Sequence, residues 1–248
     1  MSIKITARVE SYDVQPNGNI KVSSLLKMLQ KAAGDDANST ALNYDSMAAL
    51  NMAFVLTKMT VKILQDIKLY DELVIISHPR KTRGASFPRD FIVKVDNTVV
   101  AVARSMWVLL DLEKRTILRP SAVDSLGSLA ISDDDEFDLP DVRRVIDINS
   151  LSRTDVLSVK YSHLDMNNHL NNTFYADFIF DCVSRNNAGS ASDKGLYLQI
   201  NYKNEARLGD DIEIFSQYNP DDNSYDFSAN NISIDKVCFT AYVRYVND

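Results

Sequence analysis

The chain has 248 residues, of which 45% are hydrophobic and 25% are charged, as is typical of a globular protein and not of a disordered one. With 27 basic and 34 acidic residues its formal net charge is −7, so it lacks the excess of cations that non-specific nucleic-acid binding requires. The sequence contains no run of about 18 apolar residues, the length that a membrane-spanning helix needs, so it predicts no membrane span.

The first half predicts a strand, a turn, a helix and a strand meander. A strand is expected at 4–12, and a turn follows around Pro16 and Gly18. The period of the apolar residues predicts a helix over 23–37, capped by Ser23 or Ser24. Four strand-like runs come next, with a hairpin turn at Asp96-Asn97 between the last two: 54–64, 72–78, 87–95 and 99–110.

The second half repeats this order. A strand is expected at 155–161, a polar turn at 163–169 and a helix at 172–186. Four strand-like runs follow: 196–203, 211–218, 225–233 and 237–246. Between the halves lies a polar stretch with an acidic run at 133–136, which indicates a solvated linker.

The duplicated pattern predicts an α+β protein with two similar domains. In each, a single helix wrapped by a curved antiparallel sheet would bury the apolar face of both. Exposed sheet edges are a liability, and two copies side by side could pair theirs into one continuous sheet. We expect an N-terminal domain at 1–122, a linker at 123–152 and a C-terminal domain at 153–248.

Chemically suggestive residues gather in the turn before the second helix. Asp165, Asn167 and His169 alternate at a spacing of two, which would place a carboxylate, an amide and an imidazole on one side of an extended chain. The start of a helix adds backbone N–H groups that favour a developing oxyanion. Each residue alone is more often a turn, cap or packing residue, but their combination favours catalysis. The matching turn of the first half has neither a carboxylate nor an imidazole.

Two further features bear on chemistry and location. The cysteines, Cys182 and Cys238, stand far apart, and only His163 and His169 among the three histidines are close in sequence. This spacing predicts no metal site, no cofactor and no disulfide framework. Charges within the first eight residues argue against a signal peptide, so we expect a cytoplasmic protein.

The stretch 164–172 together with Tyr175 resembles the acyl-ACP thioesterases, whose hallmark is D-x-N-x-H-x-N-N followed by Tyr. Three weaker elements stand in the order that this family has: 88–91, 103–111 and 202–206. The resemblance covers nearly the whole chain. It implies two hotdog domains in tandem and hydrolysis of fatty acyl-acyl carrier protein, which releases free fatty acid and terminates fatty acid synthesis.

By the same resemblance, Asp165, Asn167, His169 and Glu205 match the catalytic positions. Ala206 stands where the family pattern has a cysteine, so a thiol nucleophile is excluded there. We expect Glu205, His169 or both to polarise a water molecule, with Asp165 orienting Asn167 or His169. Asn167 and an N–H of the helix start would bind the carbonyl oxygen. Direct attack by a carboxylate is left open.

The resemblance also places the acyl chain beside the helix of the first domain. The candidates are flexible or aromatic apolar residues, for which plain hydrophobic core is the alternative interpretation: Leu25, Met28, Leu29, Met52, Phe54 and Met59. Because the carrier protein is acidic, a local basic patch is expected to dock it. Candidates are Arg80, Lys81, Arg83 and Arg89, for which a solvated hairpin tip is the alternative.

Two other functions stay open. The second half alone also resembles hotdog acyl-CoA thioesterases, and a non-catalytic acyl-binding module would need the same fold without turnover. The tandem copy and the strand containing Trp107 favour the carrier-protein branch. A homodimer through the remaining sheet edges is a further alternative to a monomer.

Overall fold

The structure, a computed structural model, describes residues 3–40, 42–126, 151–186 and 193–245. Its strands form one antiparallel sheet of 11 strands, in which β6 pairs only with β5 and the others follow the order β1-β3-β4-β5-β2-β8-β11-β10-β9-β7. The first half contributes β1 (Ile3–Arg8), β2 (Met52–Ile63), β3 (Glu72–Pro79), β4 (Ser86–Val95), β5 (Thr98–Asp111) and β6 (Thr116–Leu118). The second contributes β7 (Ser152–Ser158), β8 (Leu196–Tyr202), β9 (Asp211–Asn219), β10 (Ser224–Asn231) and β11 (Lys236–Tyr245).

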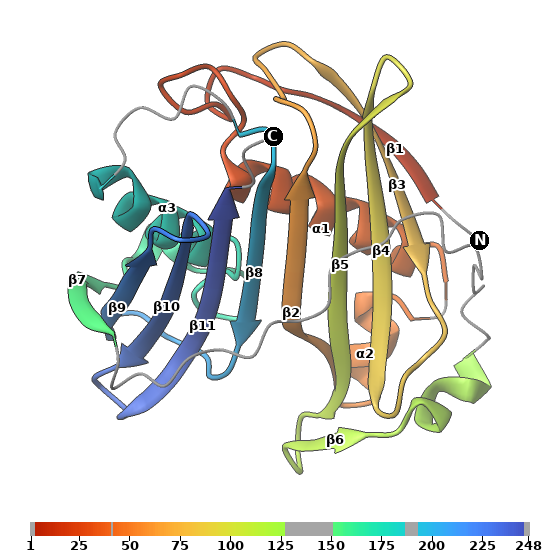
Figure 1. The fold of residues 1–248 in the computed structure, drawn as a ribbon. Helices are drawn as coiled ribbons and strands as arrows, with labels where there is room; N and C mark the ends of the chain where they lie inside the picture. The colour runs from red at the N-terminus through yellow and green to blue at the C-terminus, as the bar shows by residue number, and fades with distance from the viewer. Residues whose placement is uncertain (1–2, 41, 127–150, 187–192, 246–248) are drawn as a thin grey trace.

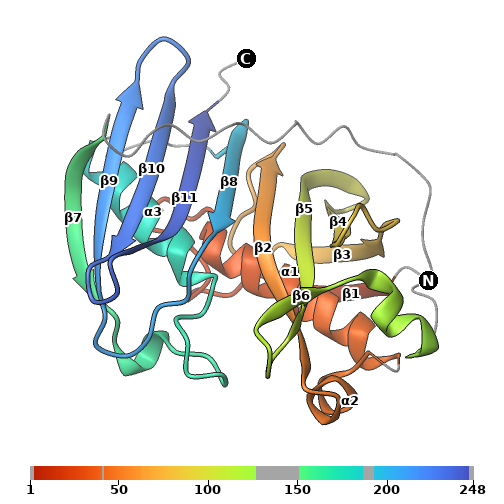
Figure 2. The ribbon, with the colours of Figure 1, turned by 90° about the horizontal axis from the view of Figure 1, so that it is seen from below.

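Each half has one long helix against its part of the sheet. The helix α1 (Val22–Asn38) lies on the first half and α3 (Phe174–Asn186) on the second, and both cover the same face (Figure 1). Figure 2 shows the same arrangement after a quarter turn, with the sheet curving around the two helices. This confirms the α+β class and the helix-wrapped sheet that the duplicated pattern predicts.

The two halves are joined through the sheet itself. β2 pairs with β8 in antiparallel register from Lys58 opposite Asn201 to Lys62 opposite Tyr197. The predicted pairing of the edges of the two copies is therefore confirmed. The outer ends of the sheet are β1 and β7.

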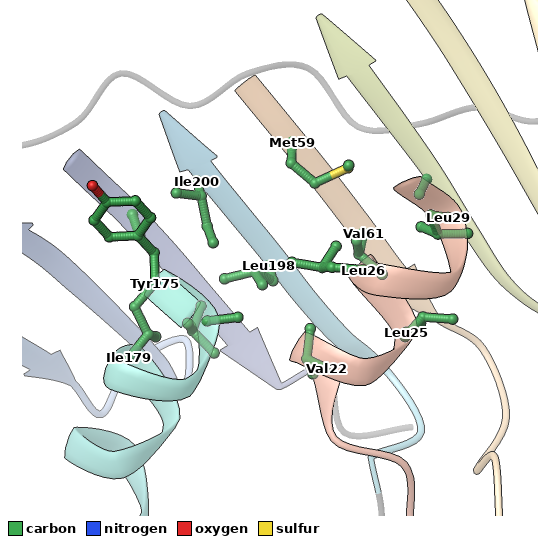
Figure 3. Packing of buried hydrophobic residues seen from close by; sticks show 14 of the residues in the cluster. Val22, Leu25, Leu26, Leu29, Met59, Val61, Tyr175, Ile179, Leu198 and Ile200 are labelled. Atoms are coloured by element: carbon green, nitrogen blue, oxygen red, sulfur yellow. The ribbon is translucent and has the colours of Figure 1, made fainter. Parts of the chain in front are cut away.

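One continuous apolar core lies between the helices and the sheet. In Figure 3, Leu26 of α1 meets Val61 of β2 on one side of β8, while Tyr175 and Ile179 of α3 lie on its other side. Leu198 and Ile200 of β8 bridge the two groups, and all of these side chains are buried. Each such side chain contributes about 1.5–3 kcal/mol on burial, so the joint between the halves is stabilised as a core and not as a loose domain contact.

The start of α1 and the insertions at one end of the first half differ from the predictions. α1 begins at Val22 with Lys21 as its N-cap and no side-chain capping bond, and Ser23 and Ser24 are buried inside the helix instead of capping it. The sequence reasoning missed a short helix α2 (Tyr44–Ala49), β6 and the 3₁₀ segment η1 (Pro120–Leu126). Met47 of α2 and Val123 of η1 join Leu42, Phe87 of β4 and Leu109 of β5 in a second, smaller apolar cluster.

The predicted boundary at residue 122 falls within η1, and most of the predicted linker, 127–150, lies outside the described residues. β7 begins at Ser152, one residue before the predicted start of the second domain. In the described part of the chain, no helix is both long and apolar enough to cross a membrane.

Candidate active site

The turn that precedes α3 is held together by the carboxylate of Asp165. Its Oδ1 accepts the backbone N–H of Asn167 at 2.8 Å and that of His169 at 3.3 Å. The backbone N–H of Asp165 in turn donates to the carbonyl of His169, and Asn168 takes a left-handed φ of 59° at the tip. Asp165 therefore contacts both Asn167 and His169 through their backbone, and fixes the loop that carries them.

A second segment, which follows β8, completes the site. The backbone N–H of Leu170 donates to the carbonyl of Ala206 at 2.8 Å, which places the loop beside residues 203–207. His169 Nε2 then lies 3.3 Å from Glu205 Oε2, and the two side chains are 27% and 39% exposed. An imidazole and a carboxylate thus meet in a partly solvated position, as a pair that activates water requires.

The surroundings of Glu205 are cationic. Arg207 Nη2 lies 4.0 Å from Glu205 Oε2, and Arg115 Nη2 lies 3.6 Å from the same oxygen. Arg115 belongs to the turn between β5 and β6, so the first half contributes a charge to a site built by the second. Sequence reasoning missed this residue because nothing in the local pattern links it to Glu205.

Asn167, the amide among the predicted catalytic residues, is exposed, and α3 begins seven residues after it at Phe174. The side chain of Asn167 is open to solvent, as an oxyanion-binding group in an unliganded site can be. Asn171 Oδ1 accepts the N–H and the hydroxyl of Thr173, at 3.0 and 2.8 Å, immediately before α3.

The other nearby candidates have structural roles. His163 Nδ1 accepts the backbone N–H of Lys160, its ring packs 5.0 Å from Phe174, and burial lowers its pKa, so it stays neutral. Tyr175 is 4% exposed, and burial raises the pKa of its phenol, which keeps it protonated inside the core.

Neither cysteine is placed for chemistry. Cys182 and Cys238 are fully buried and are not joined in a disulfide, and burial raises the pKa of the Cys238 thiol to about 12. A protonated, inaccessible thiol is a poor nucleophile. Ala206, the residue beside Glu205, is buried as well. Among the described residues no group of His, Cys, Asp or Glu could hold a metal ion.

The six predicted acyl-chain residues divide between two apolar clusters. Leu25, Leu29 and Met59 are buried in the main core, and Met28 packs against it. Met52 and Phe54 pack, partly exposed, against the smaller cluster. Both lie at the start of β2, and the antiparallel β2–β8 pairing puts that end of the sheet beside the end of β8 from which Glu205 follows.

The predicted docking cations also divide. Arg80 Nε bonds Asp90 Oδ2 at 2.9 Å, Arg89 Nη1 bonds Asp36 Oδ2 at 2.7 Å, and each of the two arginine side chains is only 11% exposed. Arg104 bonds the same Asp90 carboxylate, so one acid is shared there by two guanidinium groups. Arg80 and Arg89 are mostly buried, which disfavours a docking role, but that role stays a prediction. Lys81 and Arg83 are exposed and stay a prediction.

The first half repeats the backbone geometry of the loop 165–170 without its carboxylate and imidazole. Gln15 N–H donates to the carbonyl of Asn19, as Asp165 N–H does to that of His169, and Ile20 N–H donates to Ile67 as Leu170 N–H does to Ala206. By this correspondence Asn19 matches His169, and Asp66 matches Glu205.

In the first half, a residue of the second half, Asp193, bonds to Asp66 and to Gln15 of the turn that precedes α1. Asp66 Oδ1 accepts the backbone N–H of Asp193 at 2.8 Å, and Gln15 Nε2 donates to Asp193 Oδ2 at 2.7 Å. Asp193 is 5% exposed, and its burial together with the negative charge of Asp66 raises its pKa to about 6. Asp66 and Asp193 were missed, because only the fold brings them together.

Comparison with known proteins gives the fold a family. Residues 2–123 match the acyl-ACP thioesterase N-terminal domain and residues 148–241 match the acyl-ACP thioesterase C-terminal domain. A chloroplastic oleoyl-acyl carrier protein thioesterase from Coriandrum sativum is 23% identical over 202 residues, covering 75% of this chain and 54% of that protein. The chain therefore spans about half the length of this curated relative.

Solved structures agree in fold over the whole chain. An acyl-ACP thioesterase from Bacteroides thetaiotaomicron superposes with a TM-score of 0.85 at 18% identity, covering 99% of this chain and 98% of that one. A 12:0-ACP thioesterase from Umbellularia californica gives a TM-score of 0.76 at 16% identity, covering 100% and 98%. These likenesses, together with the two matched domains, show a tandem hotdog fold.

Proposed function

This chain belongs to the acyl-ACP thioesterase family, and on that premise we propose that it hydrolyses the thioester bond between a fatty acyl chain and acyl carrier protein. The product is free fatty acid, whose release terminates chain growth in fatty acid synthesis. The observation that carries the proposal is the contact of His169 Nε2 with Glu205 Oε2 at 3.3 Å in a partly exposed position.

The proposed mechanism assigns one task to each polar side chain. A water molecule held between His169 and Glu205 loses a proton to this pair as its oxygen attacks the thioester carbonyl. The carbonyl oxygen, which becomes negative, is stabilised by the Asn167 amide and an N–H at the start of α3. Collapse of the intermediate breaks the carbon–sulfur bond, and the proton taken up by the pair passes to the leaving thiolate.

Asp165 acts in this mechanism as a positioning residue. Its Oδ1 already accepts two backbone N–H groups of the loop, which supports a role in holding His169 and Asn167 in place. Attack by the Glu205 carboxylate itself is the alternative. Label found in Glu205 after a single turnover in ¹⁸O-labelled water would show direct attack, because water can then open the acyl–Glu205 anhydride at the Glu205 carbonyl and the released acid takes an unlabelled oxygen.

For the acyl chain, we propose that Met52 and Phe54 line the part nearest the thioester. Their partial exposure and their position at the start of β2 support this choice over Leu25, Leu29 and Met59, whose side chains fill the main core. Met28, which packs partly buried against the main core, stays in the proposed set.

The experiment that tests the function measures free fatty acid released from a panel of acyl-ACPs, with the matching acyl-CoAs alongside. We expect turnover of acyl-ACP that falls by about 10²–10⁴-fold in His169→Ala, the usual range for loss of a general base. Turnover of acyl-CoA alone would assign the chain to acyl-CoA hydrolysis. If the folded protein binds acyl groups but turns over neither substrate, the result would favour a non-catalytic acyl-binding module.

Two assignments about its setting are further proposals. A cytoplasmic location is supported by two buried cysteines that form no disulfide, which suits a reducing compartment. A homodimer would use β1 or β7, because these strands stand at the ends of the sheet. Sedimentation at increasing protein concentration measures the oligomeric state.

A further inference from the structure

Two arginines from opposite halves of the chain converge on Glu205. Arg115 comes from the turn between β5 and β6, where its φ of 52° bends the backbone, and Arg207 follows Glu205 by two residues. Their side chains are 67% and 65% exposed, and their Nη2 atoms lie 3.6 and 4.0 Å from the same carboxylate oxygen. Ion pairs this long and this exposed contribute little to stability. Both guanidinium groups therefore lie beside Glu205 while most of their surface faces solvent.

Cations gather at the Glu205 carboxylate although the chain as a whole is acidic. Two guanidinium groups on one carboxylate leave an excess positive charge at that point, and the exposed Lys203 stands two residues before Glu205. Acids lie around them: Asp111 is 3.7 Å from Lys114 in the turn of Arg115, Glu113 is exposed in the same turn, and Asp210 accepts the backbone N–H of Arg207. The net charge of the chain is −7, so an acidic partner is repelled overall and needs a local group of cations on which to bind.

Large apolar side chains are exposed next to these charges in the sequence. Leu112 lies in the same turn as Arg115, Leu208 follows Arg207, and Met166 lies in the loop that carries His169. They are 48%, 58% and 72% exposed. Arginine and methionine are enriched at protein interfaces, and exposed apolar groups rimmed by polar ones mark interaction sites. We call Arg115, Arg207, Lys203, Leu112, Leu208 and Met166 the entrance surface.

We propose that the acidic carrier protein docks on the entrance surface and contacts both halves of the chain, with Arg115 and Arg207 as its main electrostatic contacts. This inference rests on the proposed function. A carrier-bound thioester hangs from an arm fixed to the surface of the carrier, so the carrier must lie over the opening through which the arm reaches His169 and Glu205. The buried ion pairs of Arg80 and Arg89 leave the entrance surface as the stronger candidate.

The internal repeat supplies a matched control. The backbone N–H of Arg207 donates to Asp210 Oδ2 at 2.9 Å, and that of Lys68 donates to Asp71 Oδ2 at 2.8 Å. Lys68 therefore holds the corresponding position in the first half, at the other end of the sheet, and Lys68→Glu makes the same change in charge as Arg207→Glu.

The test compares Arg115→Glu, Arg207→Glu and Lys68→Glu on two substrates at low salt, acyl-ACP and a carrier-free acyl-N-acetylcysteamine thioester. We expect each arginine variant to raise the KM for acyl-ACP by at least about tenfold and Lys68→Glu to change it by less than about twofold. Any loss of kcat/KM on the carrier-free thioester should be at least about fivefold smaller than the loss on acyl-ACP. Raising the salt concentration should weaken the wild type towards the variants.

Three results would overturn the docking site. Equal losses on both substrates would mean that the arginines act through Glu205. A larger rise in KM from the double variant Lys81→Glu/Arg83→Glu would place docking on the β3–β4 turn. The affinity of the enzyme for the carrier protein itself can be measured by fluorescence anisotropy. An affinity that is unchanged in both arginine variants would also contradict the docking site. The affinity measurement needs no turnover, so it separates failure of docking from failure of the proposed hydrolysis. If a charge-reversal variant does not fold, Arg115→Gln or Arg207→Gln takes its place.

Discussion

The buried carboxyl of Asp193 should make the protein less stable as the pH rises through 6. Asp193 lies where the second half enters β8, beside Asp66 and Gln15 of the first half, and its pKa is raised from 3.8 to about 6. A carboxyl whose pKa is higher in the folded than in the unfolded chain stabilises the fold while it is protonated. That contribution is fully present below about pH 4 and is lost as the pH rises through about 6.

The size of the effect follows from the shift. Two pKa units correspond to about 3 kcal/mol of unfolding free energy. Asp193→Asn keeps an oxygen that can accept the hydrogen bond from Gln15 and removes the charge beside Asp66. We therefore expect the variant to match the wild type near pH 3.5 and to exceed it by about 2–3 kcal/mol at pH 8, which is about 5–10 °C in Tm for a chain of this length.

The assay is urea or thermal unfolding of both proteins between pH 3.5 and 8.5. Asp235→Asn, which removes one charge from an exposed turn where Asn tolerates the positive φ, is the matched control. Turnover should be unchanged in Asp193→Asn, because Asp193 and His169 lie at opposite ends of the sheet. Stability curves of wild type and variant that stay parallel across this pH range would refute the reasoning.

Three further changes test other parts of the structure. Asp36→Ala should cost about 3–5 kcal/mol of unfolding free energy, because it leaves the buried charge of Arg89 without its acidic partner. The double variant Asp36→Leu/Arg89→Met should cost much less. Equal losses for the two in denaturant unfolding would argue against a buried ion pair. Phe54→Trp should shift the preferred substrate to shorter acyl chains in a competition assay, and an unchanged profile would remove Phe54 from the proposed acyl site. Ala206→Cys should leave kcat within about threefold of wild type, because a thiol buried there is a poor nucleophile; a large gain in rate that iodoacetamide abolishes would contradict this.

The sequence predicts the fold where local pattern and duplication carry the information. The positions of α1 and α3, the hairpin at Asp96-Asn97 and the pairing of the halves follow from periodicity, turn residues and the cost of an open sheet edge. Both residues of that hairpin turn take positive φ, as a two-residue turn requires. The short α2 was missed because six residues show too little periodicity to be distinguished from a loop.

Contacts between distant residues could not be read in the same way. Arg80 and Arg89 look like a basic patch in the sequence, but in the fold both are mostly buried in ion pairs with Asp90 and Asp36. For the site, the sequence supplied Asp165, Asn167 and His169 as a group and Glu205 only by resemblance. It could not supply Arg115, because a charge contributed across two domains leaves no spacing to recognise.

The central claim is that His169 and Glu205 act as one unit on the attacking water. The most direct measurement is kcat at saturating acyl-ACP for His169→Ala, Glu205→Gln and the double variant, with folding checked by Tm. Residues that act as a unit give non-additive losses, so the double variant should be no more than about threefold slower than the slower single variant. Losses that multiply in the double variant, or a single variant that keeps the wild-type rate, would contradict the account.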